Sequence, residues 1–369
     1  MDIKIAILLL IAVSSVSSQE YIFCLYGIIN NTYTCNFNIN NPAGRLDFPT
    51  IDGSHVAGYT DSDVKGITTG YIASTAFLPP IICNKFQNLE TITLKSIGLT
   101  TILNGALDGC PLVSSIDLSS NGIKHFDEGV FVNNSKLNWL NLERNNITDL
   151  PAGLFMSLEN LTELRLYMNQ ISNLKIEWFR GLTSLEFVYL GMNQIQDIPG
   201  NTFNNSRQLR QIWIDNNNLE VIHSNSFGTL PALTAMNFMY NQIDAIDERI
   251  LNKTGINLLI LTNNVCKDGF FSDDTPGRPG MRTFFRECFD NYEEQFPACI
   301  PDNLMERVCK LEEENIELSA RVSALEQEKE ELEVKFEGQI KSLLSAIEGL
   351  QSQIDELKSG TTVAVTPTD

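Results

Sequence analysis

The chain has 369 residues, of which 43% are hydrophobic, and its formal net charge is −20. That length accommodates a large core and an additional segment. The charge argues against a nucleic-acid partner, because no basic stripe is present to neutralise phosphates, and against an anionic membrane surface.

Residues 1–18 have the composition of a secretory signal peptide. Lys4 precedes an apolar run, and small residues end at Ser18. The run is too short to span a bilayer comfortably, and no later stretch is apolar for long enough. We therefore expect a secreted, soluble protein without a membrane span. Eight cysteines in an exported chain predict a disulfide framework.

Residues 19–63 are predicted to form an N-terminal cap, because the first turn of a solenoid exposes its apolar end. Cys24 and Cys35 lie in this segment, where a disulfide between them would staple a hairpin. Residues 64–86 form a degenerate turn whose phase the pattern leaves open.

Residues 64–265 are predicted to be a repeat array. The clearest copy begins at Leu137 and has the pattern L-x-x-L-x-L-x-x-N-x-I, with its asparagine at Asn145. The spacing between copies is 24 residues, and 23 at the last step. Aligned asparagines occur at Asn121, Asn145, Asn169, Asn193, Asn217, Asn241 and Asn264. A fixed period of this length indicates a solenoid.

The residue types of the repeat explain the expected fold. The Leu-x-Leu segment alternates inward and outward, so each turn adds one short strand to a parallel sheet. Stacked turns share one apolar core, and the asparagine amide can bond to backbone groups of the neighbouring turn. The pattern resembles the extracellular type of leucine-rich repeat. The predicted fold is an α/β solenoid, a horseshoe with a concave parallel sheet.

Cys83 and Cys110 fall on the return path of consecutive turns. Stacked turns are about 5 Å apart, close to the Cα separation of a disulfide. We predict that these two cysteines pair; the alternative is two free buried thiols.

Residues 266–301 lose the repeat and are predicted to form a C-terminal cap. With the segment that follows they contain Cys266, Cys288, Cys299 and Cys309. Four cysteines allow three connectivities. We favour Cys266 with Cys288 and Cys299 with Cys309, and an interchain bridge through Cys299 remains open.

Residues 302–358 carry a heptad pattern, with Leu311, Leu318 and Leu325 at d positions and Asn315 at an a position. A four-residue stutter after Leu332 shifts the frame without breaking the seam. The pattern predicts a parallel two-stranded coiled coil, as a homodimer or heterodimer. The alternative is a lone amphipathic helix folded back on the solenoid. The polar tail, residues 359–369, is expected to be disordered.

Side chains that point outward from the concave strands include several large rings. The candidate partner-binding residues are Trp139, Arg165, Tyr167, Phe187, Tyr189, Trp213, Met239 and Tyr240. Outward aromatics on adjacent turns form a patch of the kind that marks an interaction site. The alternative is that these rings pack on one another, or under the coiled-coil helix.

Six glycosylation sequons begin at Asn30, Asn133, Asn146, Asn160, Asn204 and Asn252. Those in the repeats fall on loops or the return path, so attached glycans would leave the concave face bare.

No catalytic or metal-binding constellation is present. His55, His125 and His223 are scattered, and we interpret them as surface or loop residues. The sequence has no Gly-rich phosphate loop and no nucleophile elbow. We expect neither an enzyme nor a cofactor.

The order of signal peptide, cysteine cap, repeats, second cysteine region and coiled coil resembles the mosquito leucine-rich-repeat immune proteins. That resemblance implies a circulating assembly in which coiled coils join two chains, disulfides can lock them, and a complement-like thioester protein is held. The expected function is secreted recognition in innate immunity, of a protein partner or a microbial surface. The alternative is a matrix, adhesion or developmental ligand-modulating protein with the same solenoid.

Overall fold

The computed structural model describes residues 21–41, 51–272 and 279–296. The chain divides into two compact units, residues 1–297 and 298–369, and all described residues belong to the first. The predicted signal peptide, coiled coil and tail lie outside the described residues, as do Cys299 and Cys309. No helix in the described part of the chain is long and apolar enough to cross a membrane.

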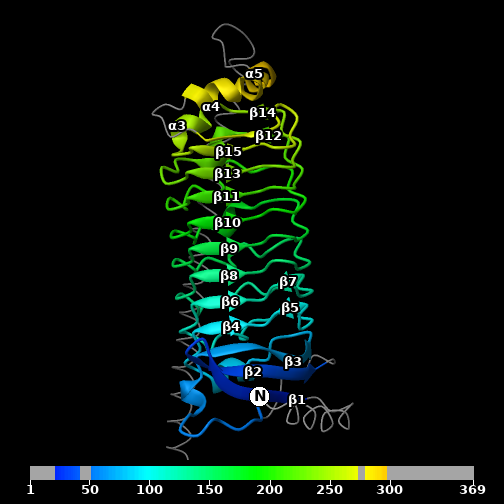
Figure 1. The fold of residues 1–369 in the computed structure, drawn as a ribbon, viewed down its shortest axis with the longest axis vertical. Helices are drawn as coiled ribbons and strands as arrows, with labels where there is room; N and C mark the ends of the chain where they lie inside the picture. The colour runs from blue at the N-terminus through cyan, green and yellow to red at the C-terminus, as the bar shows by residue number, and fades with distance from the viewer. Residues whose placement is uncertain (1–20, 42–50, 273–278, 297–369) are drawn as a thin grey trace, which may run out of the picture. The chain divides into compact units, whose positions relative to one another are not determined.

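The N-terminal cap is an antiparallel hairpin of β1 (Tyr21–Ile29) and β2 (Thr32–Asn41). Cys24 and Cys35 form a disulfide within it, with 5.1 Å between their Cα atoms. The hairpin caps the apolar end of the sheet because β2 pairs in parallel with β3 (Gly66–Thr75) (Figure 1). A short 3₁₀ helix, η1 (Asp61–Asp63), lies in the connection.

Strand β3 resolves the stretch that the sequence left without a phase. It pairs in parallel with β4 (Thr91–Thr93), with Ile67 opposite Ile92, so it is the first turn of the solenoid. Glycine at position 66 lets β3 lie close to β4, because a Cβ atom there would be 2.7 Å from the hydroxyl oxygen of Thr91.

The central repeats each contribute one short parallel strand, as predicted (Figure 1). After β4 these are β6 (Ser115–Asp117), β8 (Trp139–Asn141), β9 (Glu163–Arg165), β10 (Phe187–Tyr189), β11 (Gln211–Trp213), β13 (Ala235–Asn237) and β15 (Leu258–Ile260). The register advances by one turn at each step, so Leu140 lies opposite Leu164 and Leu164 opposite Val188. Identical positions of successive turns therefore form columns on the sheet.

Short elements make up the rest of each turn. The helical ones are α2 (Ile81–Lys85), η2 (Ile176–Phe179), η3 (Ser224–Phe227) and α3 (Ile250–Lys253). Two-residue strands pair one turn apart: β5 (Thr101–Ile102) with β7 (His125–Phe126), and β12 (Val221–Ile222) with β14 (Ala245–Ile246).

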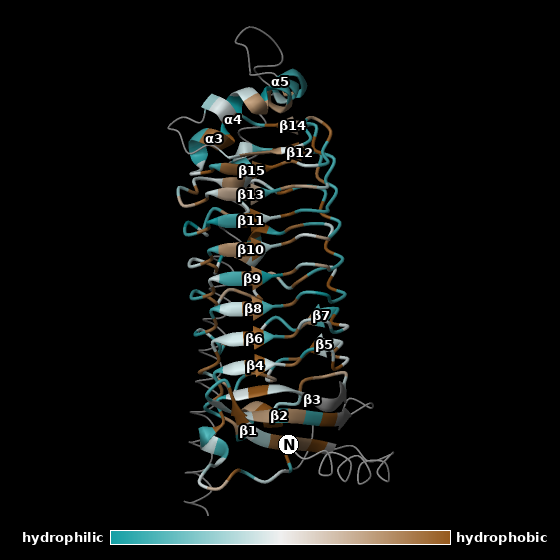
Figure 2. Cartoon of the chain, viewed as in Figure 1, coloured by the Kyte–Doolittle hydropathy of each residue, from teal (hydrophilic) through white to brown (hydrophobic). Residues whose placement is uncertain are grey.

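The core lies between the main sheet and the return path, where the inward leucines and isoleucines are buried. Figure 2, in which hydrophobic residues are brown, shows brown segments recurring in successive turns. Buried phenylalanines at the same 24-residue spacing reinforce it: Phe131, Phe155, Phe179, Phe203 and Phe227. The ring centroids of Phe179 and Phe203 are 4.7 Å apart. The continuous core that the repeat predicted is thus present.

The asparagine of each turn bonds to backbone groups, as the sequence predicted. Asn145 donates from Nδ2 to the carbonyl of Leu142 at 3.0 Å and to that of Leu118, one turn earlier, at 3.1 Å. Its Oδ1 accepts from the backbone N–H of Ile123 at 3.1 Å. One amide therefore satisfies buried groups of two turns at once.

The C-terminal cap covers the last turn. Strand β16 (Phe270–Ser272) pairs antiparallel with β15, and helices α4 (Pro279–Phe284) and α5 (Arg286–Gln295) follow. Apolar cap residues, including Phe285 and Phe289, are buried in the core.

The described residues contain two further disulfides, and both are pairs that the sequence analysis favoured. Cys266 and Cys288 join the last turn to α5, with Cα atoms 5.0 Å apart. Cys83 and Cys110 join consecutive turns, with Cα atoms 4.9 Å apart.

Candidate functional site

The outer face of the sheet is the surface formed by the strand residues that point away from the core. In β9, Leu164 is buried while Glu163 and Arg165 are partly exposed, and β10 and β11 repeat this alternation. Because the strands are in register, the outward residues of neighbouring turns lie side by side. The face is thus a regular grid of side chains whose identities differ from turn to turn.

A stripe of four large side chains crosses this face, and we call Trp139, Arg165, Tyr189 and Trp213 the aromatic–arginine stripe. The guanidinium of Arg165 lies 4.7 Å from the ring centroid of Tyr189 and 5.9 Å from that of Trp139. The rings of Tyr189 and Trp213 are tilted by 31° with centroids 6.2 Å apart. Cation–π contacts of this kind contribute about 0.5–1 kcal/mol each at exposed sites.

Two glutamates hold Arg165 in place. Its Nη1 lies 3.2 Å from Oε1 of Glu143, and its Nε donates to Glu163 in the same strand. Burial lowers the pKa of Arg165, but the hydrogen bonds and charges of Glu163 and Glu143 outweigh this and raise it above its ordinary value. The stripe is therefore built around one fixed cation with two anions beside it.

The other predicted contact residues also lie on the outer face. Tyr167 donates from its hydroxyl to Sδ of Met192 at 2.7 Å. Phe187 and Met239 are half-buried, whereas Tyr240 is 51% exposed. The rings therefore pack partly on one another and partly face solvent. Their role in partner binding stays a prediction.

Asn141, an outward strand position by sequence, is not available for contacts. It is only 6% exposed, and its Oδ1 accepts from the backbone N–H of Glu143 at 2.9 Å. Asn237 and Asp117 make the equivalent bond in their turns, to Met239 and Ser119. These polar side chains close the bend after the strand, so they shape the face without reaching a ligand.

Gly191, which follows β10, was not among the contact residues predicted from the sequence. The neighbouring turns place Tyr167 and Asp215 at the same position. A Cβ atom on Gly191 would lie 2.6 Å from Oδ1 of Asp215, so the carboxylate occupies the space that a side chain would fill. The signal in the sequence is a glycine in a column whose other central members are large or charged.

The sequon asparagines lie away from this face. Asn30 is exposed at the turn between β1 and β2, and Asn146 is half-buried. The others are exposed: Asn133, Asn160, Asn204 and Asn252. None of the six belongs to an outward strand position, which agrees with the sequence-based placement.

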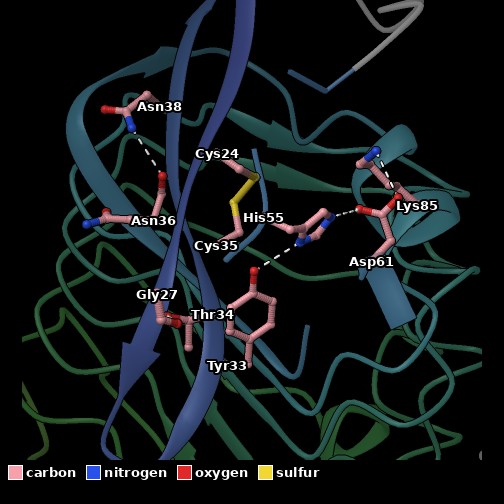
Figure 3. Close-up of a disulfide and its surroundings, with 10 residues drawn as sticks. All are labelled: Cys24, Gly27, Tyr33, Thr34, Cys35, Asn36, Asn38, His55, Asp61 and Lys85. Carbon is pink, nitrogen blue, oxygen red and sulfur yellow. Dashed lines mark hydrogen bonds and ion pairs between the residues drawn. A yellow bond between two sulfur atoms is a disulfide. The ribbon is translucent and has the colours of Figure 1, made fainter. Parts of the chain in front are cut away.

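The histidines do not form a site. His55 lies in a loop of the cap, where Nδ1 is 3.0 Å from the hydroxyl of Tyr33 and Nε2 is 2.8 Å from Oδ1 of Asp61 (Figure 3). Lys85 holds the other oxygen of Asp61 at 3.0 Å. Tyr33 is only 5% exposed, so this network anchors the cap loop rather than presenting a reactive group.

His223 instead contacts α5, where its Nδ1 lies 3.0 Å from the hydroxyl of Tyr292. His125 is exposed at the start of β7. The described residues contain no cluster of three or more groups able to hold a metal ion.

Comparison with known proteins supports the repeat architecture. Residues 111–171 and 159–218 match the family described as Leucine rich repeat. No curated protein matches the sequence. Among solved structures 428 chains match. One is a crystal structure of a TLR13–ssRNA13 complex, with a TM-score of 0.52 and 26% identity over 55% of this chain.

That match covers 29% of the TLR13 chain, so the protein described here corresponds to less than a third of its length. The matches and the register of the sheet together show a leucine-rich repeat solenoid with disulfides.

Proposed function

We propose that this chain is a secreted, non-enzymatic recognition protein of innate immunity. It binds a protein partner through the outer face of its sheet and dimerises through residues 302–358. The resemblance to the mosquito immune proteins supports the immune setting, and the similarity to TLR13 is in line with it. A leucine-rich repeat array supports a binding role.

The aromatic–arginine stripe is the observation that carries the proposal. Large rings and an arginine are the residue types that dominate protein interfaces. Here they lie on adjacent strands, partly open to solvent, with a fixed cation between them.

The disulfides support an oxidising environment. Cys24–Cys35, Cys83–Cys110 and Cys266–Cys288 are all buried, and structural disulfides persist mainly in exported proteins. Secretion also agrees with the predicted signal peptide.

RNA is the competing ligand, because the similar TLR13 structure is a complex with ssRNA13. The charges of this chain argue against it. The net charge is −20, and Arg165 at the centre of the face is already paired with two glutamates. Phosphate binding needs cations that are free to displace counterions.

Partner capture tests the proposal directly. The full chain, immobilised, is expected to retain a specific protein from body fluid, identified by mass spectrometry. Substitution of Tyr189→Ser together with Trp213→Ser should abolish capture while circular dichroism shows an intact fold. Val132→Ser is the matched control, because Val132 is 59% exposed and lies on the return path.

If the Tyr189→Ser and Trp213→Ser variant captures the partner as well as wild type does, the outer face is not the binding surface. Binding of a single-stranded RNA oligonucleotide at physiological salt, lost with Arg165→Ala, would instead favour the RNA alternative. The setting is tested separately: transcript levels that rise in blood cells or fat tissue after microbial challenge support immunity, whereas constant expression in structural tissue supports the matrix or developmental alternative.

A further inference from the structure

The column of outer-face residues two positions after each strand has one gap. Its members on consecutive turns are Glu143, Tyr167, Gly191, Asp215 and Met239. Backbone bonds continue the ladder through this column: Arg144 N–H donates to Tyr167 O at 2.9 Å, and Met192 N–H donates to Asp215 O at 2.8 Å. Gly191 alone lacks a side chain there, and the carboxylate of Asp215 occupies the space that one would fill. We call this position, with the Asp215 carboxylate over it, the Gly191 notch.

The carboxylate of Asp215 forms one side of the Gly191 notch. Asp215 is only 9% exposed, and its nearest oxygen would be 2.6 Å from a Cβ atom on Gly191. Its Oδ2 accepts one hydrogen bond, from Nδ2 of Asn216 at 2.9 Å. In the described part of the chain no lysine, arginine or histidine pairs with Asp215. A nearly buried anion without a cation partner is an unusual feature of a protein surface.

Two tyrosines and a methionine neighbour Gly191 in its column or along its turn. Tyr167 lies on the turn before Gly191, and its hydroxyl donates to Sδ of Met192 at 2.7 Å. Tyr189 precedes Gly191 by two residues in the same turn, and its ring neighbours that of Trp213. The electron-rich faces of such rings attract cations, and the ring of Tyr189 already holds the guanidinium of Arg165, 4.7 Å from its centroid.

The surrounding charges also favour a cation. Burial and then the charge of Asp215 raise the pKa of Tyr167, with Glu143 adding to the effect and Arg144 opposing it. Burial and then Glu163 raise the pKa of Tyr189, against the opposing charge of Arg165. The negative charges near both rings thus outweigh the positive ones.

We propose that the Gly191 notch binds a lysine or arginine side chain of the protein partner, with its cationic group against the Asp215 carboxylate and the ring of Tyr167. This inference rests on the proposed function, because it assigns one anchor point within the same face. A single carboxylate is a poor site for a divalent metal ion, which requires several oxygen ligands. A phosphate or an acidic peptide would be repelled by Asp215. A basic peptide segment fits both the charge and the ring of Tyr167.

The test measures binding of fluorescein-labelled octalysine and octa-arginine to the full chain by anisotropy at about 0.15 M salt, where long-range attraction is screened. Octaglutamate is the negative probe. Asp215→Asn should weaken binding of the basic peptides about tenfold. Asp197→Asn is the matched control, because Asp197 is exposed, unpaired in the described structure, off the outer face and one turn away. It should change affinity less than twofold.

Gly191→Ala is the second variant. The new methyl group displaces the carboxylate of Asp215 without changing the charge, so affinity for both basic peptides should again fall. If Asp215→Asn and Asp197→Asn weaken peptide affinity equally, or if Gly191→Ala binds with wild-type affinity, the peptides are held by the overall negative charge. Either result would contradict the notch proposal.

The two proposals fail differently. If Asp215→Asn and Gly191→Ala do not weaken binding of the basic peptides, but Tyr189→Ser with Trp213→Ser still abolishes partner capture, only the notch proposal fails. If Tyr189→Ser with Trp213→Ser leaves partner capture unchanged, while Asp215→Asn still weakens binding of the basic peptides, the proposed function fails and the notch remains.

Discussion

At the residue scale, Asn193 shows how one side chain ties two turns together. Its Nδ2 donates to the carbonyls of Leu166 at 3.0 Å and Leu190 at 2.9 Å, and its Oδ1 accepts from Ile171 N–H at 3.0 Å. Asn193→Ala would leave these buried groups without partners. Such groups cost about 1–3 kcal/mol each, so the free energy of unfolding should fall by about 3 kcal/mol.

Urea denaturation followed by circular dichroism measures this change. Gln194→Ala is the control, because Gln194 is the next residue and its side chain is exposed. If both variants unfold at the same urea concentration, the asparagine bonds contribute little to stability.

Asp247 should give the fold a dependence on pH. Its side chain is 4% exposed; burial alone would raise its pKa, but bonds from Arg249 and Ser224 lower it below the ordinary 3.8. Since the folded-state pKa is the lower one, the stabilisation is fully present above the unfolded value. It disappears as the pH falls through the folded-state pKa.

Asp247→Asn is therefore expected to lower the free energy of unfolding by about 2 kcal/mol at pH 7, because the charged hydrogen bonds are lost. The difference in melting temperature between wild type and variant should shrink as the pH is lowered from 5 toward 2. A difference that stays constant over this range would contradict the assignment.

At the element scale, the Cys83–Cys110 disulfide links α2 to the following turn across 27 residues of sequence. Closing a loop of that length raises the free energy of the unfolded chain by about 3.5 kcal/mol in the entropic description. Replacing both cysteines by serine should lower stability by about this amount. The rings of the outer face should keep their near-ultraviolet circular dichroism, because β8 to β11 lie further along the sheet.

Thermal unfolding with and without a reducing agent provides the check. Reduction should destabilise the wild-type protein more than the double-serine variant, since the variant retains only the other two disulfides of the described residues. Identical shifts on reduction would mean that this bridge contributes nothing.

At the scale of the whole molecule, residues 302–358 are predicted to join two copies or two different chains. In an isolated preparation of the full chain, sedimentation velocity should show a dimer at micromolar concentration. Leu318→Glu places a charge at a d position and should give a monomer. Ala320→Glu adds the same charge at an f position of the heptad and should remain dimeric. A wild-type monomer at high micromolar concentration would contradict homodimer formation.

The repeat was predictable because its signal is periodic. Fixed spacing of Leu140, Leu164 and Asn145 with their counterparts specified the parallel register, the core and the asparagine bonds. The stretch at β3 was not predictable, because its register depends on pairing with the hairpin β1–β2, which carries no repeat. The Cys83–Cys110 pair followed from the stacking distance once the turns were aligned, whereas the connectivity of Cys266 and Cys288 was left open by the sequence.

The outer face was predictable in position but not in detail. Alternation placed Arg165 and Tyr189 outward, yet it could not show that Arg165 is held by glutamates of two turns. Asn141 has the spacing of a contact residue but is used by its own bend. Gly191 matters because it has no side chain. The inward–outward alternation that identified the contact residues could not single out such a position.

The asparagine bonds also constrain how such a chain can change through evolution. Each amide serves its own turn and the preceding one, so gene duplication or loss of a whole 24-residue segment leaves every donor and acceptor matched. An insertion of a few residues within a strand would leave some of these donors and acceptors without partners. Lineages can therefore lengthen or shorten the array in whole units, and each event shifts an outward-facing side chain by one turn relative to its neighbours.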